Sequence, residues 1–158
     1  MRPAADSAAR TSEADRLSPL VRRFLKTAIL FLLFGIGLGV YMLVRRELDG
    51  VWPSPWWISA HTHALLVGFV MMMILGVALW MFPRPARDDP RFDPRLAEAA
   101  YWFLSVGTAA RVAGELMRPT IAAAGIRWTI VAGGAAQALG LAFFFWTMWS
   151  RIRGRADS

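Results

Sequence analysis

Residues 64–82 read ALLVGFVMMMILGVALWMF, a run that contains no charged side chain. About 20 apolar residues in a helix are enough to cross the hydrocarbon core of a bilayer, which is about 30 Å thick. The run therefore predicts a membrane-spanning helix. The chain as a whole agrees, because 56% of its 158 residues are hydrophobic, more than is usual in a soluble domain.

Three further segments have a similar character. Residues 28–44 and 128–150 are also uncharged. Residues 96–117 differ in containing three charged residues, namely Glu98, Arg111 and Glu115. We include this segment as a span because its centre is uncharged and because charges within a span are more often functional than disruptive. The sequence thus predicts an all-α fold, an integral membrane four-helix bundle, with spans at about 24–45, 60–82, 95–117 and 127–150.

The basic residues are distributed unevenly among the loops. The chain has 18 Lys and Arg against 11 Asp and Glu. Thirteen of the 18 fall in the N-terminal arm, around residues 84–95 or in the tail 151–155, and only four in the other two loops (Arg45, Arg46, Arg118 and Arg127). Basic loops stay on the cytoplasmic side, so both termini and the middle loop are expected there, in the cell inner membrane. The charges therefore indicate a lipid bilayer as partner and argue against nucleic acid.

The regions outside the spans complete the predicted domain organisation. Residues 1–20 lack apolar periodicity and are expected to form a disordered cytoplasmic arm. Residues 21–153 form the four-helix transmembrane domain, and residues 154–158 a short basic tail. The segment from Trp52 to Trp57 contains two prolines and three tryptophans. We expect it to lie as a non-helical aromatic belt on the outer surface.

The chain has no cysteine and only two histidines, His61 and His63. Thiolate metal sites are therefore excluded, whereas imidazole can bind heme iron, copper or zinc. Residues two apart point to nearly opposite sides of a regular helix, so one histidine should face the bundle. Gly68 should leave a flat space below His61 that a porphyrin needs. His61 is the predicted axial ligand and His63 a secondary ligand; the alternative is two histidines at the membrane boundary.

Arg111 is the second candidate site residue. An arginine within a membrane needs an anionic partner, which is either Glu115 one turn away or a heme propionate. The alternative is an Arg111–Glu115 pair that extends toward the membrane surface. We expect His61, His63, Arg111 and Glu115 to cluster in the outer third of the bundle, with the second and third spans in contact.

Glycine, glutamine and methionine residues suggest how the helices pack. Gly35 and Gly39 form a GxxxG pair, which allows close helix approach either within the chain or in a homodimer. Gln137 and the small residues around it indicate a buried face in the last span. Met71, Met72 and Met73 are expected to face lipid or to pack within the bundle, and copper binding by His63, Met71 and Met72 is a less favoured alternative.

Residues 61–84, HTHALLVGFVMMMILGVALWMFPR, resemble helix II of subunit I in the heme–copper oxidase and nitric oxide reductase superfamily. They also resemble the HxHxxLxGFxxxxIxG segment of NnrS-type membrane proteins. The matching residues are His61, His63, Leu66, Gly68, Phe69, Ile74 and Gly76. The resemblance implies a heme-binding membrane protein engaged in electron transfer or nitric oxide binding, with His61, Gly68 and Arg111 as the cofactor-binding residues.

The same comparison implies what this chain lacks. An oxidase subunit I has about twelve spans and several more histidines, so the chain is not expected to be a complete oxidase or reductase. A second axial ligand would have to come from another copy or from a larger respiratory complex. The alternative function is a cofactor-free accessory or assembly subunit of such a complex.

Overall fold

The computed structural model describes residues 3–82 and 93–149, with side chains described from residue 19 onward. The described residues are helical apart from short connections and contain no strand. The predicted cytoplasmic loop around 84–92 and the tail 154–158 lie outside the described residues. The all-helical class predicted from the sequence is therefore confirmed for the described part of the chain.

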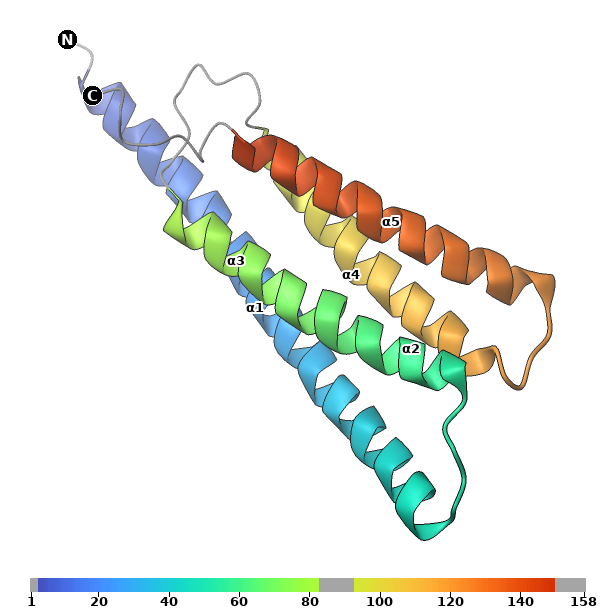
Figure 1. The fold of residues 1–158 in the computed structure, drawn as a ribbon. Helices are drawn as coiled ribbons and strands as arrows, with labels where there is room; N and C mark the ends of the chain where they lie inside the picture. Colours follow the sequence, from blue (N-terminus) through green and yellow to red (C-terminus); the bar gives the residue numbers. More distant parts are fainter. Residues whose placement is uncertain (1–2, 83–92, 150–158) are drawn as a thin grey trace.

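The helices of the described residues form four long rods, which lie side by side (Figure 1). The first is α1 (Pro3–Leu48). The second is continuous from α2 (Pro55–His63) through the π-helix η1 (Ala64–Met71) to α3 (Met72–Met81). The third and fourth are α4 (Pro94–Met117) and α5 (Ala124–Met148). We call the end formed by the connections 49–54 and 118–123 the histidine end, because His61 and His63 lie near it.

Three of the rods are long and apolar enough to cross a membrane: Pro19–Leu48, Pro55–Met81 and Ala124–Met148. Only 11% of the most apolar window of α1 is buried within the protein, and 22% of that of α5. Their apolar side chains thus face outward, as expected of helices in contact with lipid. Helix α4 has 24 residues but also carries four charged side chains, so composition alone does not make it a span.

Two boundaries differ from those expected. Helix α1 begins at Pro3, where a disordered arm was predicted. Ala is the most frequent residue in the segment 3–20, and it is the strongest helix former. Helix α2 begins at Pro55, inside the segment expected to be non-helical. Proline at the first helical position has a suitable φ and no N–H to lose, and the Ser54 hydroxyl accepts the Trp56 N–H at 3.2 Å as an N-cap.

The three tryptophan rings of the segment Trp52–Trp57 contact the neighbouring helices at the histidine end. The Trp57 indole N–H donates to the Leu116 carbonyl at 3.2 Å, which satisfies an acceptor near the end of α4. The guanidinium groups of Arg46 and Arg118 lie over the rings of Trp52 and Trp56. These contacts fix the start of α2 beside the end of α4.

The main core lies toward the opposite end and joins all four rods. Its centre is Phe24 of α1, whose ring packs edge-on against Tyr101 of α4 and Phe144 of α5 at 5.2 and 6.2 Å between centroids. The hydroxyls of Thr27 and Tyr101 hydrogen bond at 3.0 Å. Met72, which the sequence left open between facing lipid and packing, is fully buried in this core.

The π-helix keeps one face of the second rod buried. A π-helix closes i→i+5 hydrogen bonds and has a wider turn than an α-helix, so residues four apart stay nearly in line. The fully or nearly fully buried residues Ala60, Ala64, Gly68 and Met72 follow this spacing. The regular helical turn assumed in the sequence analysis therefore does not hold between Ala64 and Met71.

Helices α4 and α5 pack most closely of all. A Cβ atom at Gly133 would lie 2.7 Å from the Gly107 carbonyl oxygen and 2.9 Å from the Arg111 backbone nitrogen. These distances are too short for any side chain unless the backbones separate. The glycines therefore set the distance between α4 and α5.

We predict that Gly133→Ala lowers the free energy of unfolding by about 1–3 kcal/mol, the usual cost of overpacking. Gly125→Ala on the same helix is the matched control, because a Cβ atom there meets nothing within 4 Å, and it should leave stability unchanged or raise it. Unfolding of the detergent-purified proteins with a denaturing surfactant measures both. Equal stability of the two variants would contradict the close packing.

Candidate functional site

The two histidines leave the second rod on different sides. His61 faces α1, where its Nδ1 lies 2.9 Å from the Gly35 carbonyl oxygen. His63 faces α4, where its Nδ1 lies 3.5 Å from Glu115 Oε2. The expectation that the pair would diverge agrees with this arrangement, and the two imidazoles do not converge on one point.

His61 fits against the GxxxG pair of α1. A Cβ atom on Gly39 would lie 2.7 Å from His61 Cε1, and one on Gly35 would lie 2.5 Å from Leu65 Cδ2. The pair thus serves packing within the chain, one of the two roles left open by the sequence. Because a carbonyl oxygen only accepts, the His61 Nδ1–H is the donor to Gly35. In the neutral ring Nε2 then carries the lone pair, and it has no hydrogen-bond partner among the described residues.

The space expected beside Gly68 is not open. A Cβ atom on Gly68 would lie 2.4 Å from Cγ of Phe31, so the Phe31 ring of α1 covers this glycine. The space at Gly68 was expected to take a porphyrin, whereas within this chain the Phe31 ring of a neighbouring helix occupies it. Packing of α1 against η1 is the physical reason, and the sequence gives no sign of which apolar surface reaches a glycine.

His63 belongs to a polar cluster between α2 and α4. Its Nδ1 lies 2.8 Å from the Ser59 carbonyl oxygen, one turn earlier on the same helix. The Ser59 hydroxyl donates to Glu115 Oε1 at 2.9 Å. The Glu115 side chain is only 2% exposed. A buried carboxylate is thereby held against the histidine-bearing helix.

Arg111 extends the cluster to α5. Its Nε donates to Glu115 Oε1 at 3.1 Å, and its Nη1 donates to Gln137 Oε1 at 3.2 Å. Gln137 in turn donates from Nε2 to the hydroxyl of the fully buried Thr108 at 3.0 Å. We call these six residues the polar cluster: Ser59, His63, Thr108, Arg111, Glu115 and Gln137. It joins α2, α4 and α5 inside an otherwise apolar bundle.

The structure brings together three of the four residues that were expected to cluster. His63, Arg111 and Glu115 meet, and the second rod packs against α4 as predicted. His61 lies apart from them, on the α1 side. Arg111 uses Glu115 as its anionic partner, the first of the two partners considered.

Ser59 and Thr108 were missed by sequence reasoning, whereas Gln137 was expected on a buried face and is 5% exposed. Ser59 precedes His63 by one helical turn, a spacing that places both on one face and was the available signal. Thr108 gave none, because a threonine in a span can bond its own backbone. Among the described residues no group of three or more His, Asp or Glu side chains is placed to hold a metal ion.

Comparison with known proteins gives one finding. The model of a family described as a domain of unknown function, DUF8744, matches residues 5–152, which is nearly the whole chain. No curated protein and no solved structure matches.

We predict that Arg111→Gln lowers the free energy of unfolding by about 3–5 kcal/mol, because it leaves a buried carboxylate without its counter-charge. The double variant Arg111→Gln/Glu115→Gln should cost clearly less, since no unpaired charge remains. Arg23→Gln is the control: its pair with Glu98 is about half exposed and worth about 0–1 kcal/mol. Surfactant unfolding of all three compares them, and an Arg111→Gln effect as small as that of Arg23→Gln would contradict the pairing.

Proposed function

We propose that this chain, which belongs to the DUF8744 family, is a four-span membrane protein that binds heme through His61. Three apolar helices support a membrane location directly. We add α4 as the fourth span because its charges are not left facing lipid unpaired. Arg111 and Glu115 pair with each other, and Glu98 pairs with Arg23 near the opposite end.

The proposed orientation places the histidine end outside and both chain termini in the cytoplasm of the cell inner membrane. The uneven distribution of Lys and Arg supports this orientation. With an even number of spans the two termini share a side. The described ends of α1 and α5 accord with this, because they lie toward the same end of the bundle (Figure 1).

The single observation that carries the heme proposal is the geometry of His61. Histidines that bind metals usually donate their other ring N–H to a carbonyl or carboxylate, which fixes the tautomer and the ring orientation. His61 donates Nδ1–H to Gly35 O at 2.9 Å, and its Nε2 has no protein partner among the described residues. The resemblance of residues 61–76 to heme-binding helices points to the same residue.

The fit is confined to His61. Phe31 covers Gly68, and Arg111 is engaged by Glu115 and Gln137. Neither residue fits the propionate or porphyrin contact assigned to it within one chain. His63 has its Nδ1 directed to Ser59 and Glu115 on the far side from α1, so we assign it no ligand role. A bound heme would supply one-electron transfer or binding of a diatomic gas, and the residues of α1 would orient the imidazole.

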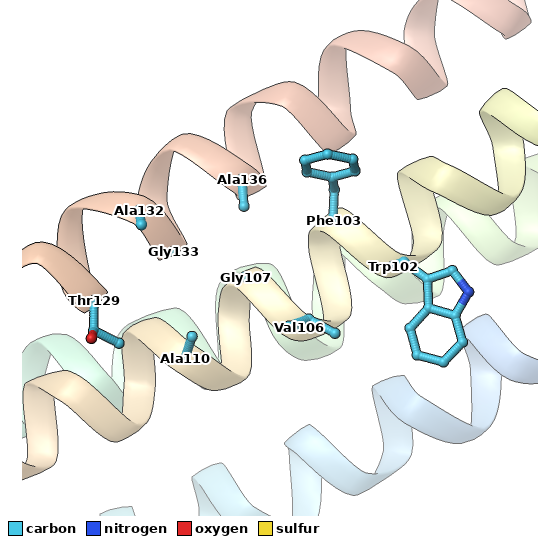
Figure 2. A pocket seen from close by; sticks show the side chains of 9 residues that line it. All are labelled: Trp102, Phe103, Val106, Gly107, Ala110, Thr129, Ala132, Gly133 and Ala136. Atoms are coloured by element: carbon cyan, nitrogen blue, oxygen red, sulfur yellow. The ribbon is translucent and has the colours of Figure 1, made fainter.

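A second candidate is a cofactor-free accessory or assembly subunit of a respiratory membrane complex. An open apolar groove of about 520 Å³ between α4 and α5 favours it. The groove is lined by the small residues Gly107, Ala110 and Ala132 and is flanked by Trp102 and Phe103 (Figure 2). Small residues let another membrane helix approach closely.

The absence of native cysteine makes the orientation directly testable. Ser54→Cys lies in the α1–α2 connection and Ser12→Cys in the N-terminal part of α1. In intact cells a membrane-impermeant maleimide should label only Ser54→Cys, and Ser12→Cys should react only after the membrane is opened. Labelling of Ser12→Cys in intact cells would overturn the proposed orientation.

The heme proposal predicts a Soret band in protein purified from heme-replete cells. His61→Ala should abolish the band, because Nε2 is the only proposed ligand, while His63→Ala should keep it. Absorption spectra of oxidised and reduced protein, with a pyridine hemochrome assay for heme content, provide the measurement. A colourless wild-type protein would exclude the proposal. If the wild type is colourless and a stoichiometric partner copurifies with it and with both histidine variants, the accessory subunit is the better description.

A further inference from the structure

One oxygen of the Glu115 carboxylate has no hydrogen-bond partner among the described residues. Oε1 accepts from both Ser59 and Arg111. Oε2 accepts no bond from any residue that the structure describes, although it is buried. Buried polar atoms are nearly always hydrogen-bonded, and an unpaired charged oxygen in a medium of low polarity is especially unfavourable. The free oxygen therefore points to a donor from outside the described protein.

His63 does not fill this role. Its Nδ1 lies 3.5 Å from Oε2, beyond the usual length of an N–H···O hydrogen bond. Nδ1 carries at most one hydrogen. Because Nδ1 lies 2.8 Å from the Ser59 carbonyl oxygen, that hydrogen is directed to Ser59. The other hydrogen bonds within the polar cluster do not reach Oε2: Arg111 donates to Oε1 and to Gln137, and Gln137 donates to Thr108.

The surroundings define the chemistry of the missing donor. A carboxylate oxygen only accepts hydrogen bonds, so the ligand must carry an O–H or N–H group. It must also be uncharged, because Arg111 already balances Glu115, and a second cation would leave a net charge in the apolar bundle. A hydroxyl group is the smallest neutral donor that meets both conditions.

We propose that Glu115 Oε2 is the acceptor of a binding site for a neutral O–H group. Two sources share this chemistry. One is a water molecule that enters from the histidine end, and the other is the hydroxyl of a lipid-soluble phenol or hydroquinone that enters from the bilayer. The site rests on the contacts of Glu115 and is independent of heme binding at His61, so either proposal stands if the other fails.

Infrared difference spectroscopy of the full-length protein in detergent tests the site. The spectrum of the double variant Arg111→Gln/Glu115→Gln is subtracted from that of the wild type, because the double variant removes the acceptor without leaving an unpaired charge. The double variant Arg23→Gln/Glu98→Gln is the matched control, since it neutralises an ion pair that is about half exposed. Circular dichroism and size-exclusion chromatography establish that each variant is folded.

Each source gives its own signal. A bound water gives an O–H stretching band that shifts when H₂¹⁶O is replaced by H₂¹⁸O and is lost in Arg111→Gln/Glu115→Gln. A phenolic ligand gives a saturable shift of the Glu115 carboxylate band when duroquinol is added, also lost in that variant. The control variant Arg23→Gln/Glu98→Gln should keep whichever signal the wild type shows.

The proposal is overturned if the wild type shows neither signal, or if the signal that it shows survives loss of the acceptor. Should the double variant fail to fold, Glu115→Asp serves instead. It keeps the charge but withdraws the carboxylate by one methylene, so the band must move or disappear. An unchanged band in Glu115→Asp would equally reject a site at Oε2.

Discussion

A carboxylate inside an apolar helix bundle must find donors and a counter-charge, and the way Glu115 does so organises the histidine end. Its Oε1 takes one bond from Ser59 of α2 and one from Arg111 of its own helix. Arg111 then reaches Gln137 of α5. Three rods are thus held in register by groups that would be costly to bury singly. The apolar contacts around them are less directional.

The opposite end of the bundle is stabilised by apolar and aromatic packing. Phe24, Tyr101 and Phe144 pack edge-on where α1, α4 and α5 meet, and no charged group lies in that core among the described residues. Between the two ends, glycines allow backbones to approach: Gly35 and Gly39 receive side chains of the second rod, and Gly133 receives the backbone of α4. Close packing of this kind replaces the hydrophobic drive that lipid does not supply.

The two histidines illustrate how a short motif divides between roles. His61 donates to α1 and keeps Nε2 unpartnered among the described residues, as a metal-binding imidazole would. His63 is drawn into the polar cluster by Ser59 and Glu115. The π-helix that starts at the next residue changes the directions in which the later side chains of the second rod point, relative to a regular α-helix. His61 and Gly68 nevertheless both face α1.

The all-helical class, the apolar membrane-length helices and the divergence of His61 from His63 could be predicted from the sequence, which also offered Glu115 as one of two partners for Arg111. Each follows from composition or from spacing along one helix, which fixes direction without reference to neighbours. The tertiary structure alone shows that Phe31 covers Gly68, that Ser59 and Gln137 complete the cluster, and that Glu115 Oε2 has no partner among the described residues. These depend on which rods lie side by side and how far apart. Residues distant in the sequence set those distances, through contacts such as Gly107 against Gly133.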